Sequence, residues 1–177
     1  MSPKDIKKIA KGIRLVIMDV DGVLTDGGII MDGEGGELKI FNVRDGHGIK
    51  LLMNSGIEVA LITGRYSKVV EQRAKDLGIK EVYQRCHIKM VAYEHLIDKL
   101  GIKDSETAYI GDDIVDIALF KRVGLSVAVA DAAKEARDSA IMTTKLPGGK
   151  GAVREFAEFL LKAKGLWNGI IKEHSKA

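Results

Sequence analysis

Polar and acidic residues follow four apolar runs of this chain, each at the point where the run ends. The junctions are 15–18 with Asp19, 59–62 with Thr63, 107–110 with Asp112, and 127–129 with Asp131. Apolar runs of this length are typical of strands buried on both faces of a parallel sheet. If the strands are parallel, all four junctions lie at one edge of the sheet, outside the carboxyl ends of the strands, where open α/β sheets bind their ligands. We therefore expect the chemistry of this protein at that edge.

The acidic residues of this edge predict a bound cation. Asp19 and Asp21 are two residues apart, and the turn after a strand can bring both carboxylates to one pocket. Asp112 and Asp116 add negative charge to the same region. A divalent cation offsets the repulsion, and a site made only of oxygen ligands favours Mg²⁺, which also accepts a phosphate oxygen from a substrate. The predicted substrates are phosphate esters or anhydrides.

Two carboxyl groups beside a cation can divide the work of phosphate transfer. One attacks phosphorus and forms an aspartyl-phosphate, while the other protonates the leaving alkoxide and later accepts a proton from water. We expect Asp19 and Asp21 in these roles, with Thr63 and one lysine stabilising the transferred phosphoryl group. Lys89 is our candidate because it lies in the first turn of a predicted helix, where a cation needs a nearby anion. Lys75 and Lys80 fit as well on physical grounds.

Alternating strand and helix signals predict a parallel sheet with right-handed crossovers. Glycines that follow apolar periodic segments predict helix ends at Gly56, Gly78 and Gly101. The expected strands cover 15–18, 57–62, 81–84, 108–110, 126–129 and 140–143, and the expected helices cover 45–55, 67–77, 88–100 and 114–122, followed by a last helix after 147–151 that ends at Gly165.

Three further segments lie outside this rhythm. Residues 28–43 alternate around the glycine-rich turn 32–36, which predicts a β-hairpin after the first strand. Apolar residues at helical spacing predict a short amphipathic helix at the N-terminus that docks onto the domain. The tail 166–177 is apolar enough to dock against something. We expect one domain, residues 1–177, without a linker.

Bulk composition excludes several classes of protein. The formal net charge is +3 and aromatic residues make up 5%, which argues against nucleic-acid binding. Cys86 is the single cysteine, so neither an internal disulfide nor a cysteine-based metal cluster can form. The chain shows neither a secretory signal nor an apolar run of the ~18 residues needed to span a bilayer, so we expect no membrane association and a cytoplasmic location.

Four motifs in this chain resemble those of the haloacid dehalogenase superfamily. The sequence DVDGVLT of residues 19–25 is similar to its DxDGxxT nucleophile motif, ITGR of 62–65 to the second motif, Lys89 to the third, and GDDIVD of 111–116 to the fourth. The resemblance implies a three-layer, Rossmann-like parallel sheet flanked by helices. It also implies Mg²⁺ held by Asp19, the main-chain carbonyl of Asp21, and Asp112. Asp113 and Asp116 would support these ligands.

The intervals between the first three motifs hold no room for a cap domain, so we expect a capless enzyme. FNVRDG of 41–46, GLSVAVADA of 124–132 and GGKGAVRE of 148–155 resemble the capless 3-deoxy-D-manno-octulosonate 8-phosphate phosphatases. This resemblance implies a homotetramer in which the hairpins assemble centrally and the C-terminal tail reaches a neighbouring active site. It also implies a role in lipopolysaccharide precursor synthesis.

A sugar acid phosphate carries a carboxylate, for which arginine is a better bidentate partner than lysine. The candidate substrate-binding residues are Thr63, Gly64, Arg65, Arg44, Lys89, Arg85 and Lys150, with Arg154 behind them. Alternatives within the same chemistry are a phosphatase for a nonulosonate 9-phosphate and a broad sugar phosphatase. Alternatives of other classes are a phospho-receiver signalling module, disfavoured because the third strand ends without an acid, and an inactive oligomeric scaffold.

Overall fold

A computed structural model describes residues 2–176. Six parallel strands form one sheet in the order β5-β4-β1-β6-β7-β8. The strands are β1 (Leu15–Met18), β4 (Glu58–Ile62), β5 (Glu81–Tyr83), β6 (Thr107–Gly111), β7 (Leu125–Ala128) and β8 (Met142–Thr143). The central strand β1 is buried along its whole length, as its unbroken apolar run predicts. The predicted α/β class and parallel sheet are confirmed.

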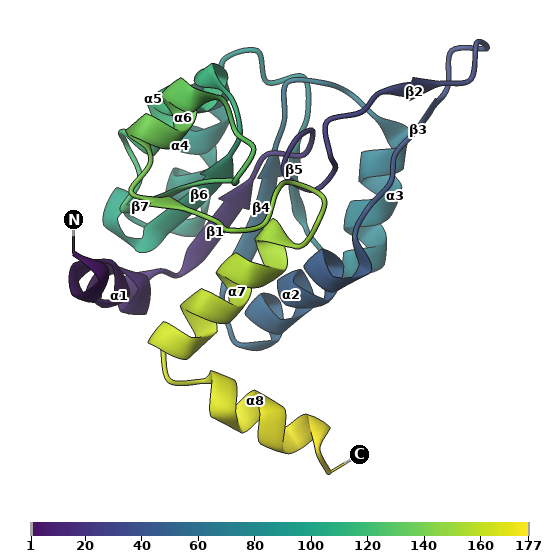
Figure 1. Ribbon diagram of the computed structural model, residues 1–177. Coiled ribbons are helices and arrows are strands. Elements are labelled where there is room, and N and C mark those ends of the chain that lie inside the picture. The colour runs from purple at the N-terminus through teal and green to yellow at the C-terminus, as the bar shows by residue number, and fades with distance from the viewer. Residues whose placement is uncertain (1, 177) are drawn as a thin grey trace.

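Helices cover both faces of this sheet and complete three layers (Figure 1). On one face α2 (Val43–Asn54) packs against α7 (Ala152–Ala163), with α1 (Pro3–Gly12) beside α7 and α3 (Lys68–Leu77) beside α2. On the other face lie α4 (Lys89–Leu100), α5 (Ile117–Phe120) and α6 (Lys134–Ser139). Within residues 2–176 no cap domain is inserted between the strands, and no helix is long and apolar enough to cross a bilayer.

The helix after the hairpin begins earlier than expected. Its N-cap is Asn42, whose side-chain oxygen accepts hydrogen bonds from the main-chain nitrogens of Arg44 and Asp45. We expected Asp45 to cap this helix, but Asp45 lies in the first turn and its carboxylate accepts hydrogen bonds from the nitrogens of Gly151 and Arg154. Asp45 therefore ties the start of α2 to the start of α7.

One other expected helix needs correction, and one helix was not expected. The predicted helix 114–122 is a 3₁₀ turn, Ile114–Asp116, followed by the short α5. The main-chain nitrogens of Asp112 and Asp113, just before this segment, donate to the Asp116 carboxylate and tighten the turn. The helix α6 was not predicted, since six residues are too few to show an apolar period. A second 3₁₀ turn, Asp104–Glu106, leads into β6.

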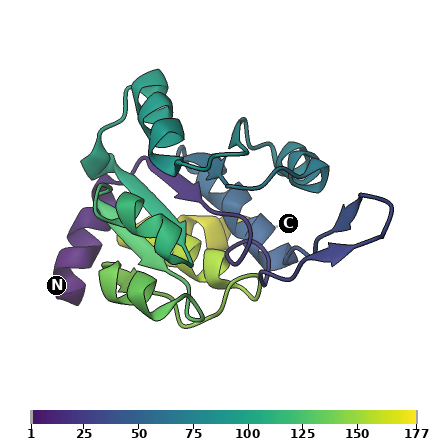
Figure 2. The same cartoon turned by 90° about the horizontal axis from the view of Figure 1, so that it is seen from above.

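Within the predicted hairpin range, β2 (Ile30–Met31) and β3 (Glu37–Leu38) pair antiparallel. Only two residues of each strand are paired, and the ribbon projects away from the sheet and its helices (Figure 2). The C-terminal tail forms a further helix, α8 (Trp167–His174), which extends beyond α7 (Figure 1). The cationic groups of Arg154 and Lys162 lie 5.5 and 5.0 Å from the centroid of the Trp167 ring.

Candidate active site

The strand register brings three of the predicted junctions together. Met18 of β1 pairs with Leu61 of β4 on one side and with Ile110 of β6 on the other. Asp19 therefore leaves the sheet beside the ends of β4 and β6, where Thr63 and Asp112 follow. Neighbouring parallel strands that end at one level place their next residues around one depression.

Three carboxylates form a compact acidic cluster at this edge. One oxygen each of Asp19, Asp112 and Asp116 lies within 4.8 Å of the others. Burial raises the pKa of Asp19 to about 6, with Asp116 adding to the effect and Lys89 opposing it. Burial, with the charges of Asp19 and Asp116, raises the pKa of Asp112 to about 7. Both carboxylates are therefore poorly solvated as anions in the metal-free site, chiefly because they are buried.

Asp116 organises this cluster from the inside. It is fully buried, and one oxygen accepts hydrogen bonds from Lys89 Nζ at 2.6 Å and Tyr109 Oη at 2.6 Å. Its other oxygen accepts from the main-chain nitrogens of Asp112 and Asp113 at 2.9 and 3.2 Å. Each Asp116 oxygen thus accepts two hydrogen bonds, whereas each Asp19 oxygen has one partner, Val20 N or Lys89 Nζ. Asp19 and Asp112 are therefore better placed than Asp116 to hold a cation.

Lys89 is the lysine that reaches the predicted nucleophile. Its Nζ lies 2.8 Å from Asp19 Oδ2 and 3.1 Å from Tyr109 Oη, and the side chain is 6% exposed. Burial alone would lower the pKa of Lys89, but Asp19 and Asp116 outweigh it and raise the pKa, so the group stays cationic. Lys75 and Lys80, the other two lysines considered from the sequence, are exposed on the surface.

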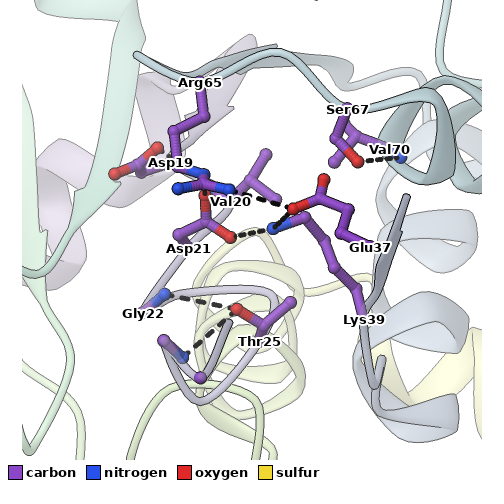
Figure 3. Close-up of polar contacts among 12 residues, drawn as sticks. Asp19, Val20, Asp21, Gly22, Thr25, Glu37, Lys39, Arg65, Ser67 and Val70 are labelled. Atoms are coloured by element: carbon purple, nitrogen blue, oxygen red, sulfur yellow. Dashed lines mark hydrogen bonds and ion pairs between the residues drawn. The ribbon is translucent and has the colours of Figure 1, made fainter. Parts of the chain in front are cut away.

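The side chain of Asp21 takes a different direction from that of Asp19 (Figure 3). It lies outside the compact cluster and forms ion pairs with Lys39 and with Arg65, whose Nε is 3.4 Å from Asp21 Oδ2. The next residue, Gly22, has φ of +83°, and a Cβ there would come within 2.0 Å of Asp112 Oδ2. Glycine therefore allows the loop after β1 to approach the end of β6.

The second predicted motif lies beside the cluster. Thr63 is buried at 3% exposure, and its main-chain oxygen accepts a hydrogen bond from Cys86 N at 3.0 Å. This bond connects the loop after β4 to the loop that leads to Lys89. Arg85 of that loop has a left-handed backbone, with φ of +59°, and its guanidinium stacks on the Tyr66 ring at 4.5 Å.

The remaining cationic candidates lie together. Arg44, Lys150 and Arg154 line a hollow of about 470 Å³ between the starts of α2 and α7. The loop that carries Lys150 packs directly on the loop after β1, residues 19–25, which we call the nucleophile loop. A Cβ at Gly148 would lie only 1.7 Å from the Gly22 carbonyl oxygen. Lys150 Nζ is 3.5 Å from the Asp26 carboxylate.

Comparison with known proteins identifies the family of this chain. The sequence model of a family described as haloacid dehalogenase-like hydrolase matches residues 79–154. A 3-deoxy-D-manno-octulosonate 8-phosphate phosphatase of Escherichia coli strain K12 is 50% identical over 161 residues, which cover 91% of this chain and 86% of the relative. The chain belongs to the family of 3-deoxy-D-manno-octulosonate 8-phosphate phosphatases.

Solved structures of this phosphatase family share the fold. The enzyme of Yersinia pestis superposes with a TM-score of 0.92 at 48% identity, covering 93% of this chain and 89% of that one. The enzyme of Moraxella catarrhalis, solved with magnesium ion, phosphate ion and KDO, superposes with a TM-score of 0.95 at 42% identity over 98% and 99% of the two chains. The resemblance recognised from the motifs is confirmed.

The donor set of this phosphatase fits a hard divalent cation. Asp19 and Asp112 offer carboxylate oxygens in a compact acidic cluster, and burial raises the pKa of both groups because their anionic forms are poorly solvated there. Oxygen-only donors of this kind suit Mg²⁺. The main-chain carbonyl of Asp21, implied as a third ligand by the family motif, lies in the same loop.

Sequence reasoning missed three residues of the site. Tyr109 points from inside β6 to Asp116, and burial raises its pKa well above the ordinary value, so its hydroxyl remains a donor. Lys39 and Glu37 reach Asp21 and Arg65 from the hairpin. The sequence indicates Glu37 and Lys39 only through the alternation of charged and apolar residues across 37–40. This alternation predicts two faces of the hairpin strand but does not say which face contacts the site.

Proposed function

We propose that this chain is a Mg²⁺-dependent phosphatase that hydrolyses 3-deoxy-D-manno-octulosonate 8-phosphate to the free sugar acid and phosphate, in lipopolysaccharide precursor synthesis. The observation that carries the proposal is the buried Asp19 at the centre of the site, beside Asp112 and in contact with Lys89. The close relatives of matching length support the substrate.

In the first step a carboxylate oxygen of Asp19 attacks phosphorus and forms an aspartyl-phosphate. The bond between phosphorus and the sugar oxygen breaks, and Asp21 donates a proton to the leaving alkoxide. Mg²⁺ held by Asp19 and Asp112 offsets the charge of the transferring phosphoryl group. Lys89 contributes a fixed positive charge next to the nucleophile, and Thr63 is a hydrogen-bond donor for a phosphoryl oxygen.

In the second step Asp21 accepts a proton from water as the water oxygen attacks the phosphorus of the aspartyl-phosphate. Inorganic phosphate leaves, and Asp19 returns to its carboxylate form. The Asp116 carboxylate keeps its orientation through both steps, because Tyr109, Lys89 and two main-chain nitrogens donate hydrogen bonds to its oxygens. Asp113 caps the 3₁₀ turn through Ile114 N at 2.7 Å and so supports the loop that carries Asp112.

The substrate carboxylate needs a cationic partner close to the phosphate site. Arg65 is adjacent to the second motif and its side chain is 45% exposed, so it can turn towards a ligand. Arg85 follows β5 on the same edge of the sheet, and Gly64 leaves space between the two loops. Arg44 and Lys150, at the hollow on the other side of the nucleophile loop, are candidates for the distal end of the sugar acid.

The same proposal includes a homotetramer in the cytoplasm. Apolar side chains on the hairpin and at the start of α2 are exposed: Ile30 at 46%, Met31 at 72%, Leu38 at 61%, Ile40 at 68% and Val43 at 81%. An apolar surface of this kind on a projecting ribbon is typical of a face covered by another subunit. Sedimentation analysis of the wild-type protein against a Leu38→Glu variant measures whether this face holds copies together.

Phosphate release tests the proposal. We expect Mg²⁺-dependent hydrolysis of 3-deoxy-D-manno-octulosonate 8-phosphate, abolished by chelation and reduced at least ~10³-fold by Asp19→Asn. Asp98→Asn, at an exposed position on α4, is the matched control and should keep full activity. Faster hydrolysis of a nonulosonate 9-phosphate would assign the alternative substrate. An active Asp19→Asn variant would contradict the mechanism.

A further inference from the structure

The hairpin presents two different faces around β3. Leu38 and Ile40 are 61% and 68% exposed, whereas the alternate residues Glu37 and Lys39 point towards the nucleophile loop. The Lys39 side chain is only 1% exposed. A lysine is almost never buried to this extent unless it is paired, because its ammonium group loses hydration. The partners of Lys39 therefore identify its role.

Those partners are the proposed acid/base and a second carboxylate. Lys39 Nζ donates to Asp21 Oδ1 and lies 3.7 Å from Glu37 Oε2 (Figure 3). Arg65 closes the network, with Nε at 3.4 Å from Asp21 Oδ2 and Nη2 at 3.0 Å from Glu37 Oε2. Glu37 Oε1 is buried without a hydrogen-bond partner among the described residues, so the remaining oxygen of Glu37 holds both cations.

The two cations that hold Asp21 differ in freedom. Lys39 is enclosed and binds Oδ1, whereas the Arg65 side chain is 45% exposed and binds Oδ2 over a longer distance. An arriving anionic substrate competes for Arg65 but cannot reach Lys39 without moving the hairpin. Loss of the Arg65 contact would release Oδ2 of Asp21, while Oδ1 would keep its contact with Lys39.

We propose that Lys39 is a positioning residue for Asp21. The hairpin then supplies the contact that orients the carboxyl group responsible for proton transfer to the leaving alkoxide. This inference rests on the proposed function, in which Asp21 is that acid. It assigns to the hairpin a role in the chemistry of its own subunit, in addition to any role in assembly.

Substrates whose leaving groups differ in their need for a proton can distinguish a positioning role of Lys39 from a purely structural one. The value of kcat/KM covers the steps up to transfer of the phosphoryl group to Asp19. A sugar alkoxide needs a proton to leave, whereas p-nitrophenolate leaves without one. Misplacement of Asp21 should therefore slow the sugar phosphate and spare the aryl phosphate.

The experiment compares kcat/KM for 3-deoxy-D-manno-octulosonate 8-phosphate and p-nitrophenyl phosphate in wild type, Lys39→Met and Lys39→Arg. For Lys39→Met we expect a fall of about 30- to 100-fold with the sugar phosphate, below the ~10²–10⁴-fold supplied by a general acid, and less than about 3-fold with the aryl phosphate. Lys39→Arg should recover part of the loss. Lys99→Met, which removes a lysine paired with Glu81 away from the site, should change neither value.

The ratio of the two kcat/KM values does not depend on how much of a variant is folded. If Lys39→Met does not fold, Glu37→Gln weakens the anchor of Lys39 and should move the ratio in the same direction by a smaller factor. Equal losses with both substrates, or an unchanged ratio in both variants, would overturn the inference. A wild-type protein that hydrolyses neither substrate would instead overturn the proposed function.

Discussion

The acidic cluster predicts that removing one of its charges stabilises the metal-free protein while it destroys the metal site. The pKa of Asp112 is raised from 3.8 to about 7, chiefly by burial and then by the charges of Asp19 and Asp116. At about 1.4 kcal/mol per pKa unit this corresponds to roughly 4 kcal/mol, and partial exposure of the group reduces it to roughly 2 kcal/mol. Asp112→Asn removes this cost of ionisation.

The sign of the effect fixes its pH dependence. A carboxyl group with a raised pKa in the folded state loses its proton first in the unfolded chain, so the metal-free protein loses stability as pH rises from about 4 to about 7. In chelator at pH 8, Asp112→Asn should therefore have a free energy of unfolding about 2 kcal/mol above wild type. At pH 5 the gain should fall to less than half.

Urea unfolding at both pH values, with chelator and with Mg²⁺, measures these differences. Mg²⁺ should raise the stability of wild type at pH 8 and leave Asp112→Asn nearly unchanged, because a ligand stabilises only the state that binds it. Asp98→Asn, an exposed charge on α4, should stay within ~0.5 kcal/mol of wild type throughout. If Asp112→Asn is less stable than wild type in chelator at pH 8, or gains equally from Mg²⁺, the electrostatic reasoning is refuted.

Three further changes test the packing around the site. Gly148→Ala should lower the free energy of unfolding by about 1–3 kcal/mol, since its Cβ would meet the Gly22 carbonyl oxygen at 1.7 Å. Gly169→Ala on α8, which has open space around it, should cause no such loss. Equal denaturation midpoints for the two variants would contradict this expectation. Asn42→Ala should cost about 1 kcal/mol through the lost cap of α2, measured by thermal unfolding, and no change would mean that the cap is dispensable. Deleting 166–177 should change kcat or KM without unfolding the sheet, measured by kinetics beside circular dichroism, and unchanged kinetics would remove the tail from the site.

Local patterns in the sequence predicted the sheet and the position of its functional edge. The apolar runs 15–18 and 59–62, which lie in β1 and β4, place Asp19 and Thr63 at strand ends, because polar residues are rare within a strand that is buried on both faces. The glycine ends of α3 and α4 were also predicted, since Gly78 and Gly101 adopt the left-handed conformation that closes a helix. The start of α2 was placed wrongly, because Asn42 and Asp45 are both good capping residues and packing against α7 engages Asp45 instead.

Only the tertiary structure decided which charged groups meet. The first turn of a predicted helix favoured Lys89 over Lys75 and Lys80, but its contact with Asp19 exists only because the start of α4 meets Tyr109 of β6. The burial of Lys39 against Asp21 depends on where the base of the hairpin meets the loop after β1. The alternation of charged and apolar residues leaves open which face of the hairpin does so, because a shift of one residue in register exchanges the two faces. Contacts between neighbouring residues can be predicted from the sequence because the local backbone conformation sets them. The ion pair between Lys39 and Asp21 joins residues eighteen positions apart, so it forms only after the fold has brought them together.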